Sequence, residues 1–170
     1  SRTLAVDSAC TGINSAGPTF TPPISVSNIE IIKILNQESN GGFTSFDASI
    51  WNGVTTIVAE SGVVGAETEI AGIVNLVAAE MKNNSSSLFI DYDADVLSGL
   101  NDAQTLVLSA NNGGSFQVEG GILETLNIVS QIGTNSINLG SHTFGTINVT
   151  GNQHVEVELG ASPSVATVNA

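Results

Sequence analysis

The sequence predicts an all-β protein, a parallel β-solenoid of about seven coils with roughly 20 residues in each coil. The first observation is a recurring pattern of six residues (apolar, any, Thr, apolar, any, apolar or small). Its central apolar residue falls at positions 32, 57, 76, 106, 126, 147 and 168, and the last four of these positions are almost evenly spaced. The second observation is an alternating apolar segment between successive copies, and the third is the series of Gly- and Asn-rich turns that separates these segments.

Each strand is predicted from period-two alternation, which places apolar side chains on one face and polar side chains on the other. The clearest copies of the six-residue pattern are residues 54–59, 103–108, 123–128, 144–149 and 165–170, with looser copies at residues 29–34 and 73–78. The intervening strands are predicted at residues 88–92, 116–118, 137–139 and 155–159. Turns are predicted at residues 111–114, 120–121, 133–135, 140, 151–152 and 160, where Gly and Asn concentrate.

Two other interpretations compete with the solenoid. A β-sandwich also has frequent turns between short strands, but it predicts no registry between residues one repeat apart. The solenoid predicts stacked columns of identical side chains, here Thr105, Thr125, Thr146 and Thr167 in one column and Asn127, Asn148 and Asn169 in another. Residues 67–82 also fit a helix, although their Val and Gly content favours strands equally well.

The composition excludes several classes of function. The 170 residues contain 16 acidic and three basic residues, a formal net charge of −13, so no groove can neutralise several phosphates and nucleic-acid binding is excluded. Hydrophobic residues make up 41% of the chain, too many for a disordered acidic tail. The longest apolar stretch, Ile70–Ala79, is about half the ~20 residues of a membrane helix, so no transmembrane segment is predicted. Cys10 is the single cysteine and cannot form an internal disulfide.

Two regions are predicted along the chain. Residues 1–23 form a lead-in rich in Ser, Gly and Pro, and residues 24–170 form the solenoid. Because the sequence opens on Ser1 and ends within a strand-like segment, we expect the chain to be an excised fragment of a longer protein.

Three phrases resemble the repeats of a known family. Residues 26–35 (VSNIEIIKIL), 43–57 (FTSFDASIWNGVTTI) and 121–128 (GILETLNI) are similar to repetitive regions of bacterial surface-layer (S-layer) proteins exported by type I secretion, which are related to the calcium-binding RTX group. The resemblance runs from about residue 24 onward. It implies a secreted, self-assembling coat protein that uses calcium. The RTX nonapeptide G-G-x-G-x-D-x-apolar-x is absent, since neither Gly113–Ser115 nor Gly120–Ile122 continues it, so calcium must bind by other means or elsewhere in a longer protein.

The densest acidic cluster is the candidate calcium site. Asp91, Asp93 and Asp95 alternate along one predicted strand face, and Asp102 follows. Carboxylates so close together repel one another, and Ca²⁺, which takes six to eight oxygen ligands, would remove that repulsion. The four aspartates match positions 1, 3, 5 and 12 of an EF-hand loop, but Val96 replaces the glycine at position 6 and no helices flank the loop, so an EF-hand is rejected. The alternative is a solvated acidic strand face that opposes edge pairing.

Other candidate sites are weaker. His142 and His154 lie half a coil apart and would not align as a metal pair. No nucleophile motif or phosphate-binding loop supports an enzyme, although a two-carboxylate glycosidase built on Asp91 or Asp93 stays open. Trp51, Phe43, Phe46 and Phe89 are expected to pack in the core or at coil corners, whereas an exposed Trp51 would instead indicate glycan stacking. Outward Thr and Asn columns also suggest ice binding, but the predicted Asn column is interrupted by Lys33, Val58, Val77 and Val107.

The function predicted from the sequence is structural: a self-assembling component of a secreted bacterial cell-surface layer, with calcium bridging acidic faces. The expected partners are copies of the same chain, in a lattice or an end-to-end array, and cell-surface polysaccharide. A stalk or glycan-binding module of a large bacterial adhesin is the first alternative. A polysaccharide-acting β-helix enzyme is the second. The expected location is extracellular, at the bacterial surface.

Overall fold

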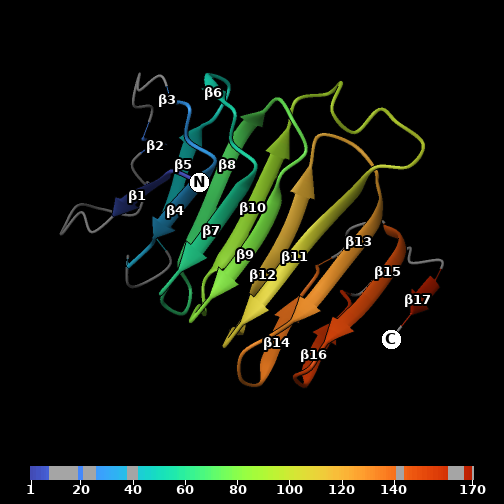
Figure 1. The fold of residues 1–170 in the computed structure, drawn as a ribbon. Coiled ribbons are helices and arrows are strands. Elements are labelled where there is room, and N and C mark those ends of the chain that lie inside the picture. Colours follow the sequence, from blue (N-terminus) through green and yellow to red (C-terminus); the bar gives the residue numbers. More distant parts are fainter. Residues whose placement is uncertain (8–18, 21–25, 38–41, 141–143, 161–166, 170) are drawn as a thin grey trace.

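The computed structural model describes residues 1–7, 19–20, 26–37, 42–140, 144–160 and 167–169. Over these ranges the chain is a parallel β-solenoid of about six turns of about 22 residues each. Two long sheets form two layers, and the chain passes from one layer to the other in every turn (Figure 1). The predicted fold class is confirmed. The sandwich alternative is wrong, because every pair of neighbouring strands that the structure describes is parallel.

The strands divide among three sheets. The eight-stranded sheet contains, in spatial order, β1 (Thr3–Asp7), β4 (Ile31–Leu35), β7 (Thr56–Glu60), β9 (Ala78–Lys82), β11 (Ala103–Ser109), β13 (Leu123–Ser130), β15 (Phe144–Gly151) and β17 (Thr167–Asn169). The seven-stranded sheet contains β16 (Val155–Glu158), β14 (Asn135–Asn138), β12 (Asn112–Glu119), β10 (Ser87–Tyr92), β8 (Glu67–Ile73), β5 (Phe43–Asp47) and β2 (Thr19–Phe20). A short third sheet pairs β3 (Val26–Ser27) with β6 (Trp51–Asn52).

Two expectations about these elements are answered directly. Residues 67–82 form β8 and β9, so the helical alternative is wrong, and the described part of the chain contains no helix. Within the stretch assigned to the lead-in, Thr3–Asp7 pairs with β4 and Thr19–Phe20 pairs with β5. Cys10 lies outside the described residues.

The register of the eight-stranded sheet corrects the repeat alignment in two places. Sequence reasoning placed Leu76 in the column of Ile57, but the structure places Ala79 there and leaves Leu76 37% exposed. Leu106 pairs with Ile128 rather than with Leu126. The reason is turn length. The column runs through positions 32, 57, 79, 106, 128 and 149, and turns of different length shift the register by two or three residues without changing the local six-residue pattern.

The predicted polar columns are confirmed in the last coils. Thr125, Thr146 and Thr167 pair in register, and so do Asn127, Asn148 and Asn169. Asn148 Nδ2 donates to Asn127 Oδ1 at 2.8 Å, which forms one rung of the ladder. Thr105 was placed in the Thr column, and this is wrong: it pairs with Asn127, because the register of β11 is shifted from the sequence alignment.

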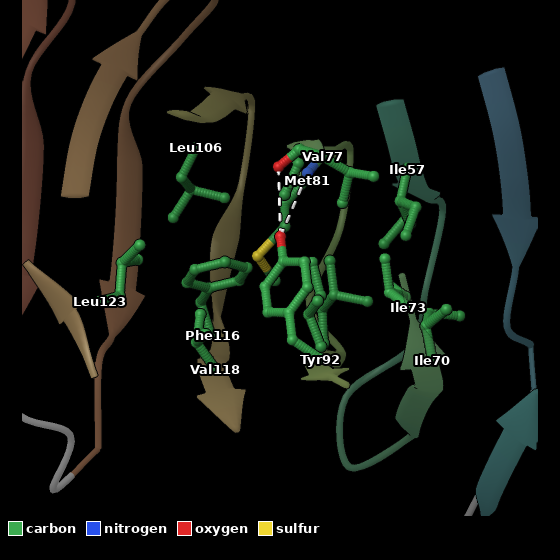
Figure 2. Packing of buried hydrophobic residues seen from close by; sticks show 14 of the residues in the cluster. Ile57, Ile70, Ile73, Val77, Met81, Tyr92, Leu106, Phe116, Val118 and Leu123 are labelled. Atoms are coloured by element: carbon green, nitrogen blue, oxygen red, sulfur yellow. Dashed lines mark hydrogen bonds between the residues drawn. The ribbon is translucent and has the colours of Figure 1, made fainter. Parts of the chain in front are cut away.

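Apolar side chains that alternate along each strand meet between the two layers. In β10, Leu88, Ile90 and Tyr92 are buried, whereas Ser87, Phe89 and Asp91 face outward. Figure 2 shows Tyr92 among Met81 and Phe116, with its hydroxyl directed at Val77. This hydroxyl accepts from the Val77 backbone N–H at 3.3 Å and lies 3.4 Å from the Val77 carbonyl, and burial raises the pKa of Tyr92 to about 12.

Buried asparagines form a second ladder at the corner where the chain leaves the eight-stranded sheet. The corner positions that stack through backbone hydrogen bonds are Asn36, Gly62, Asn84, Asn111 and Asn135, and all five are buried. Their amides hydrogen-bond main-chain and hydroxyl groups: Asn84 Nδ2 donates to Ser86 O at 2.8 Å, and Asn111 Nδ2 donates to Ser136 O at 2.6 Å. These side chains supply hydrogen-bond partners that buried polar backbone atoms need at a tight corner.

Candidate functional site

The outer surface of the seven-stranded sheet carries a run of carboxylates. We call this surface the acidic face; its carboxylates are Asp47, Glu67, Glu69, Asp91, Glu119, Glu156 and Glu158. They face outward because they alternate with the buried residues of each strand. The strands that the structure describes in this sheet contain no Lys or Arg. The acidic face is therefore not neutralised by basic residues of its own strands.

Asp91 lies close to several other carboxylates of the acidic face and its adjoining turn. It pairs in register with Glu119 of the next coil, and it lies near Glu69 of the preceding coil and Asp93. Partial burial, then the negative charges of Glu119, Glu69 and Asp93, raise the pKa of the Asp91 carboxyl above its ordinary value. A cation or a proton at this position would lower the electrostatic free energy of the fold.

The other predicted calcium ligands lie in the turns after β10. The Asp93 carbonyl accepts from the Val96 backbone N–H at 2.9 Å, and the Asp95 carbonyl accepts from Ser98 Oγ at 2.7 Å. Asp102 Oδ2 accepts from the Gly99 backbone N–H at 3.0 Å. Among the described residues, no group of three or more His, Cys, Asp or Glu side chains could hold a metal ion. Calcium binding by Asp91, Asp93, Asp95 and Asp102 stays a prediction.

The outer surface of the eight-stranded sheet has a different character, and we call it the neutral face. It consists of the outward side chains of β4, β7, β9, β11, β13 and β15. Two of the three basic residues of the chain, Lys33 and Lys82, lie on this surface. Both form an ion pair with Glu60, and the distance from Lys82 Nζ to Glu60 Oε1 is 3.7 Å. The hydrogen bond from Lys33 is the main cause that lowers the pKa of Glu60.

The remaining candidate residues separate into buried, exposed and undescribed positions. Trp51 is buried, with 7% of its surface exposed, so the expected core packing is confirmed and the condition for glycan stacking by Trp51 is not met. Phe46 is also buried. On the acidic face, Phe43 is 39% exposed and Phe89 is half-buried. His154 is exposed before β16. His142 lies outside the described residues.

The buried corner asparagines are the residues that sequence reasoning missed. Their stacking cannot be read from the sequence because Asn36, Asn84, Asn111 and Asn135 are unevenly spaced, and Gly62 takes the place of asparagine in one coil. The sequence carries no regular pattern for them, but three of these corners share a backbone conformation in the structure. At the corners of Gly62, Asn84 and Asn111, the preceding residue (Ser61, Asn83 or Ala110) has a positive φ.

The fold and its two outer faces define the chain as a parallel β-solenoid with an acidic side and a neutral side. Comparison with protein-family models, with curated proteins and with solved structures finds no match. The described residues include no helix long and apolar enough to cross a membrane.

Proposed function

We propose that this chain is a structural, self-associating module of a secreted bacterial surface layer, and that calcium reduces the repulsion between its acidic faces. The observation that carries the proposal is the separation of charge between the two sheets. Seven outward carboxylates lie on one sheet whose described strands contain no Lys or Arg, whereas both lysines lie on the other. A rod with this pattern has one side that repels its copies and one side that does not.

The repetitive scaffold supports a structural role. Each coil contacts only its neighbours, so a solenoid gains stability by adding coils and offers long, regular surfaces. A strongly negative surface keeps copies apart until a divalent cation screens or bridges the charge. The resemblance of residues 26–35, 43–57 and 121–128 to S-layer repeats favours the same function.

The proposal is tested by sedimentation velocity and thermal denaturation of the purified chain in excess EGTA, in calcium and in magnesium at matched ionic strength. We expect calcium to increase both the mean sedimentation coefficient and Tm more than magnesium does, with reversal by EGTA. Calcium-dependent stability without association would support binding but overturn self-assembly. A chain that stays monomeric with an unchanged Tm in all three buffers would overturn both parts.

A glycan-binding stalk is the second candidate, and aromatic side chains on the acidic face favour it. Phe89 is half-buried between Glu69 and Gln117 and precedes Asp91 on the same side of β10, and Phe43 is 39% exposed on β5. Partly exposed aromatic rings beside carboxylates are suited to stack on sugar rings while the carboxylates accept hydrogen bonds from the sugar hydroxyls. A glycan array probed with the wild-type chain and with Phe89→Ala tests this candidate. Specific binding that Phe89→Ala abolishes would support it, and an array without binding would exclude it.

A further inference from the structure

Charge is distributed unequally along the neutral face. Towards the N-terminus, its outward charged residues are two lysines and two glutamates, namely Lys33, Lys82, Glu60 and Glu80, which balance. The outward columns of β11, β13 and β15 contain Ala, Thr, Asn and Val and carry no charge. The charged residue in these three strands is Glu124, the second residue of β13, whose carboxylate accepts a hydrogen bond from the Asp102 backbone N–H at 2.9 Å. In a chain with net charge −13, this is the sheet surface through which two copies can meet without strong repulsion.

The neutral face also costs little free energy to dehydrate. Asn127 and Asn148 hydrogen-bond each other, and Thr150 Oγ1 donates to the Ile128 carbonyl at 3.4 Å. Polar groups that are already paired lose less on burial than unpaired ones. Val107 and Val129 stand in register beside these columns and add apolar surface that is only half-buried in the single chain.

The size of the neutral face fits a protein interface. The six strands of the neutral face each take up about 4.8 Å of width and together span roughly 30 Å, and about five residues along a strand span about 17 Å. The resulting surface is about 500 Å² per copy, or about 1,000 Å² for two copies, which reaches the lower limit of specific interfaces.

We propose that the neutral face is the surface through which this chain associates with a second copy of itself, neutral face against neutral face. The inference rests on the proposed self-assembly and adds which side of the solenoid makes the contact. Calcium at the acidic face then acts on the opposite side of the rod. It lowers the overall repulsion between copies without forming the contact itself.

The test places equal charges on either side of the rod. The double variant Thr125→Glu/Thr146→Glu adds two charges to the neutral face, and Ser45→Glu/Ser136→Glu adds two charges to the acidic face as the matched control. Sedimentation velocity of wild type and variants across concentration, in calcium, gives the association constant, and circular dichroism with Tm confirms folding. We expect at least about a tenfold weaker association for the first variant and a much smaller change for the control, because like charges brought together across an interface oppose it.

A second variant, Thr125→Lys/Thr146→Lys, distinguishes the mode of contact. If neutral faces meet each other, lysines on both copies also repel, and association weakens as it does with glutamate. If association strengthens, the neutral face of one copy meets the acidic face of another, and the proposal is overturned.

The remaining outcomes separate this inference from the proposed function. Wild-type association that survives both neutral-face variants overturns the face assignment and leaves self-assembly standing. Loss of association in the acidic-face control alone assigns the contact to the other side. A wild-type chain that never associates overturns the proposed function, and this inference with it.

Discussion

The backbone N–H of Gly62 donates a hydrogen bond to Oδ1 of Asn84 in the next coil, at 3.1 Å. The Asn84 side chain occupies the space beside Gly62 that a β-carbon would need. A β-carbon at position 62 would overlap both Asn84 Oδ1 and Ser86 Oγ. Both of these residues are buried in the corner ladder. One glycine therefore gives the asparagine of the following coil room to bond the backbone.

Gly62→Ala is expected to destabilise the fold strongly, by about 3 kcal/mol, because the new methyl group displaces two buried polar groups and breaks their hydrogen bonds. Urea denaturation followed by circular dichroism measures the change. Gly53→Ala is the control: Gly53 has φ +86°, but no atom lies within 4 Å of the place that its β-carbon would take, so only backbone strain of about 1 kcal/mol is expected there. An equal loss of unfolding free energy for Gly62→Ala and Gly53→Ala would contradict the steric explanation.

Two adjacent asparagines offer a matched pair for the corner ladder. Asn111 is fully buried, and its Nδ2 donates to the Gly113 and Ser136 carbonyls, whereas Asn112 is exposed. Asn111→Ala removes the donor to both carbonyls and should cost about 2–3 kcal/mol, while Asn112→Ala should change stability by less than about 0.5 kcal/mol. Urea midpoints compared at equal m-values test the pair. Similar midpoints for the two variants would show that the ladder contributes little.

The sequence was sufficient for the fold class because alternation predicts strands, as in β10, and identical side chains one repeat apart distinguish a solenoid from a sandwich. It was sufficient for the Thr and Asn columns of β13, β15 and β17 because the steps between these strands are equal in length. It failed at Leu76 and Leu106, where longer or shorter turns change the register without changing the local pattern. A pattern within one strand does not encode the length of the turn before it.

The two outer faces were not predictable for a related reason. The acidic residues were visible in the sequence, but their separation from Lys33 and Lys82 depends on which strands belong to which sheet. The sequence predicts that Asp91, Asp93 and Asp95 share one strand face, but β10 ends at Tyr92 and a turn follows. Asp91 instead meets Glu119 and Glu69, which are distant in sequence and come together only when the coils stack.

Ala110 adopts a left-handed backbone conformation, with φ +53°, at the corner before Asn111. A β-carbon is unfavourable in this conformation, and glycine relieves the strain. Ala110→Gly is therefore expected to stabilise the fold by about 1 kcal/mol. Ala103→Gly, in a strand, should destabilise it by a similar amount. Differential scanning calorimetry measures both, and a lower Tm for Ala110→Gly would contradict the expectation.

Glu60 links stability to pH through Lys33 and Lys82. Its pKa is lowered in the folded state, first by the Lys33 hydrogen bond and then by the two lysine charges, against the opposing effect of burial. The stabilisation is therefore present above the unfolded pKa, near 4.5, and is lost as the pH falls through the folded pKa. Glu60→Gln should cost about 0.5–1 kcal/mol at pH 7, a cost that disappears at acidic pH. The control is Glu80→Gln, an outward glutamate of β9, and a pH-independent cost for Glu60→Gln would indicate packing rather than charge.

Asp91 affects the pH dependence of stability in the opposite direction to Glu60, because folding raises the pKa of the Asp91 carboxyl. Its ionised form destabilises the fold at neutral pH, and this penalty is relieved as the pH falls through the folded pKa. Asp91→Asn should therefore raise stability at pH 7 by about 0.5 kcal/mol, with no gain at pH values below the ordinary carboxyl range. Asp47 on the same face is the control: hydrogen bonds from Ser49 Oγ and N–H lower the pKa of its carboxyl, so Asp47→Asn should destabilise at pH 7. If calcium acts at the acidic face, it should raise Tm less in Asp91→Asn than in wild type. An equal calcium response in both would place the ion elsewhere.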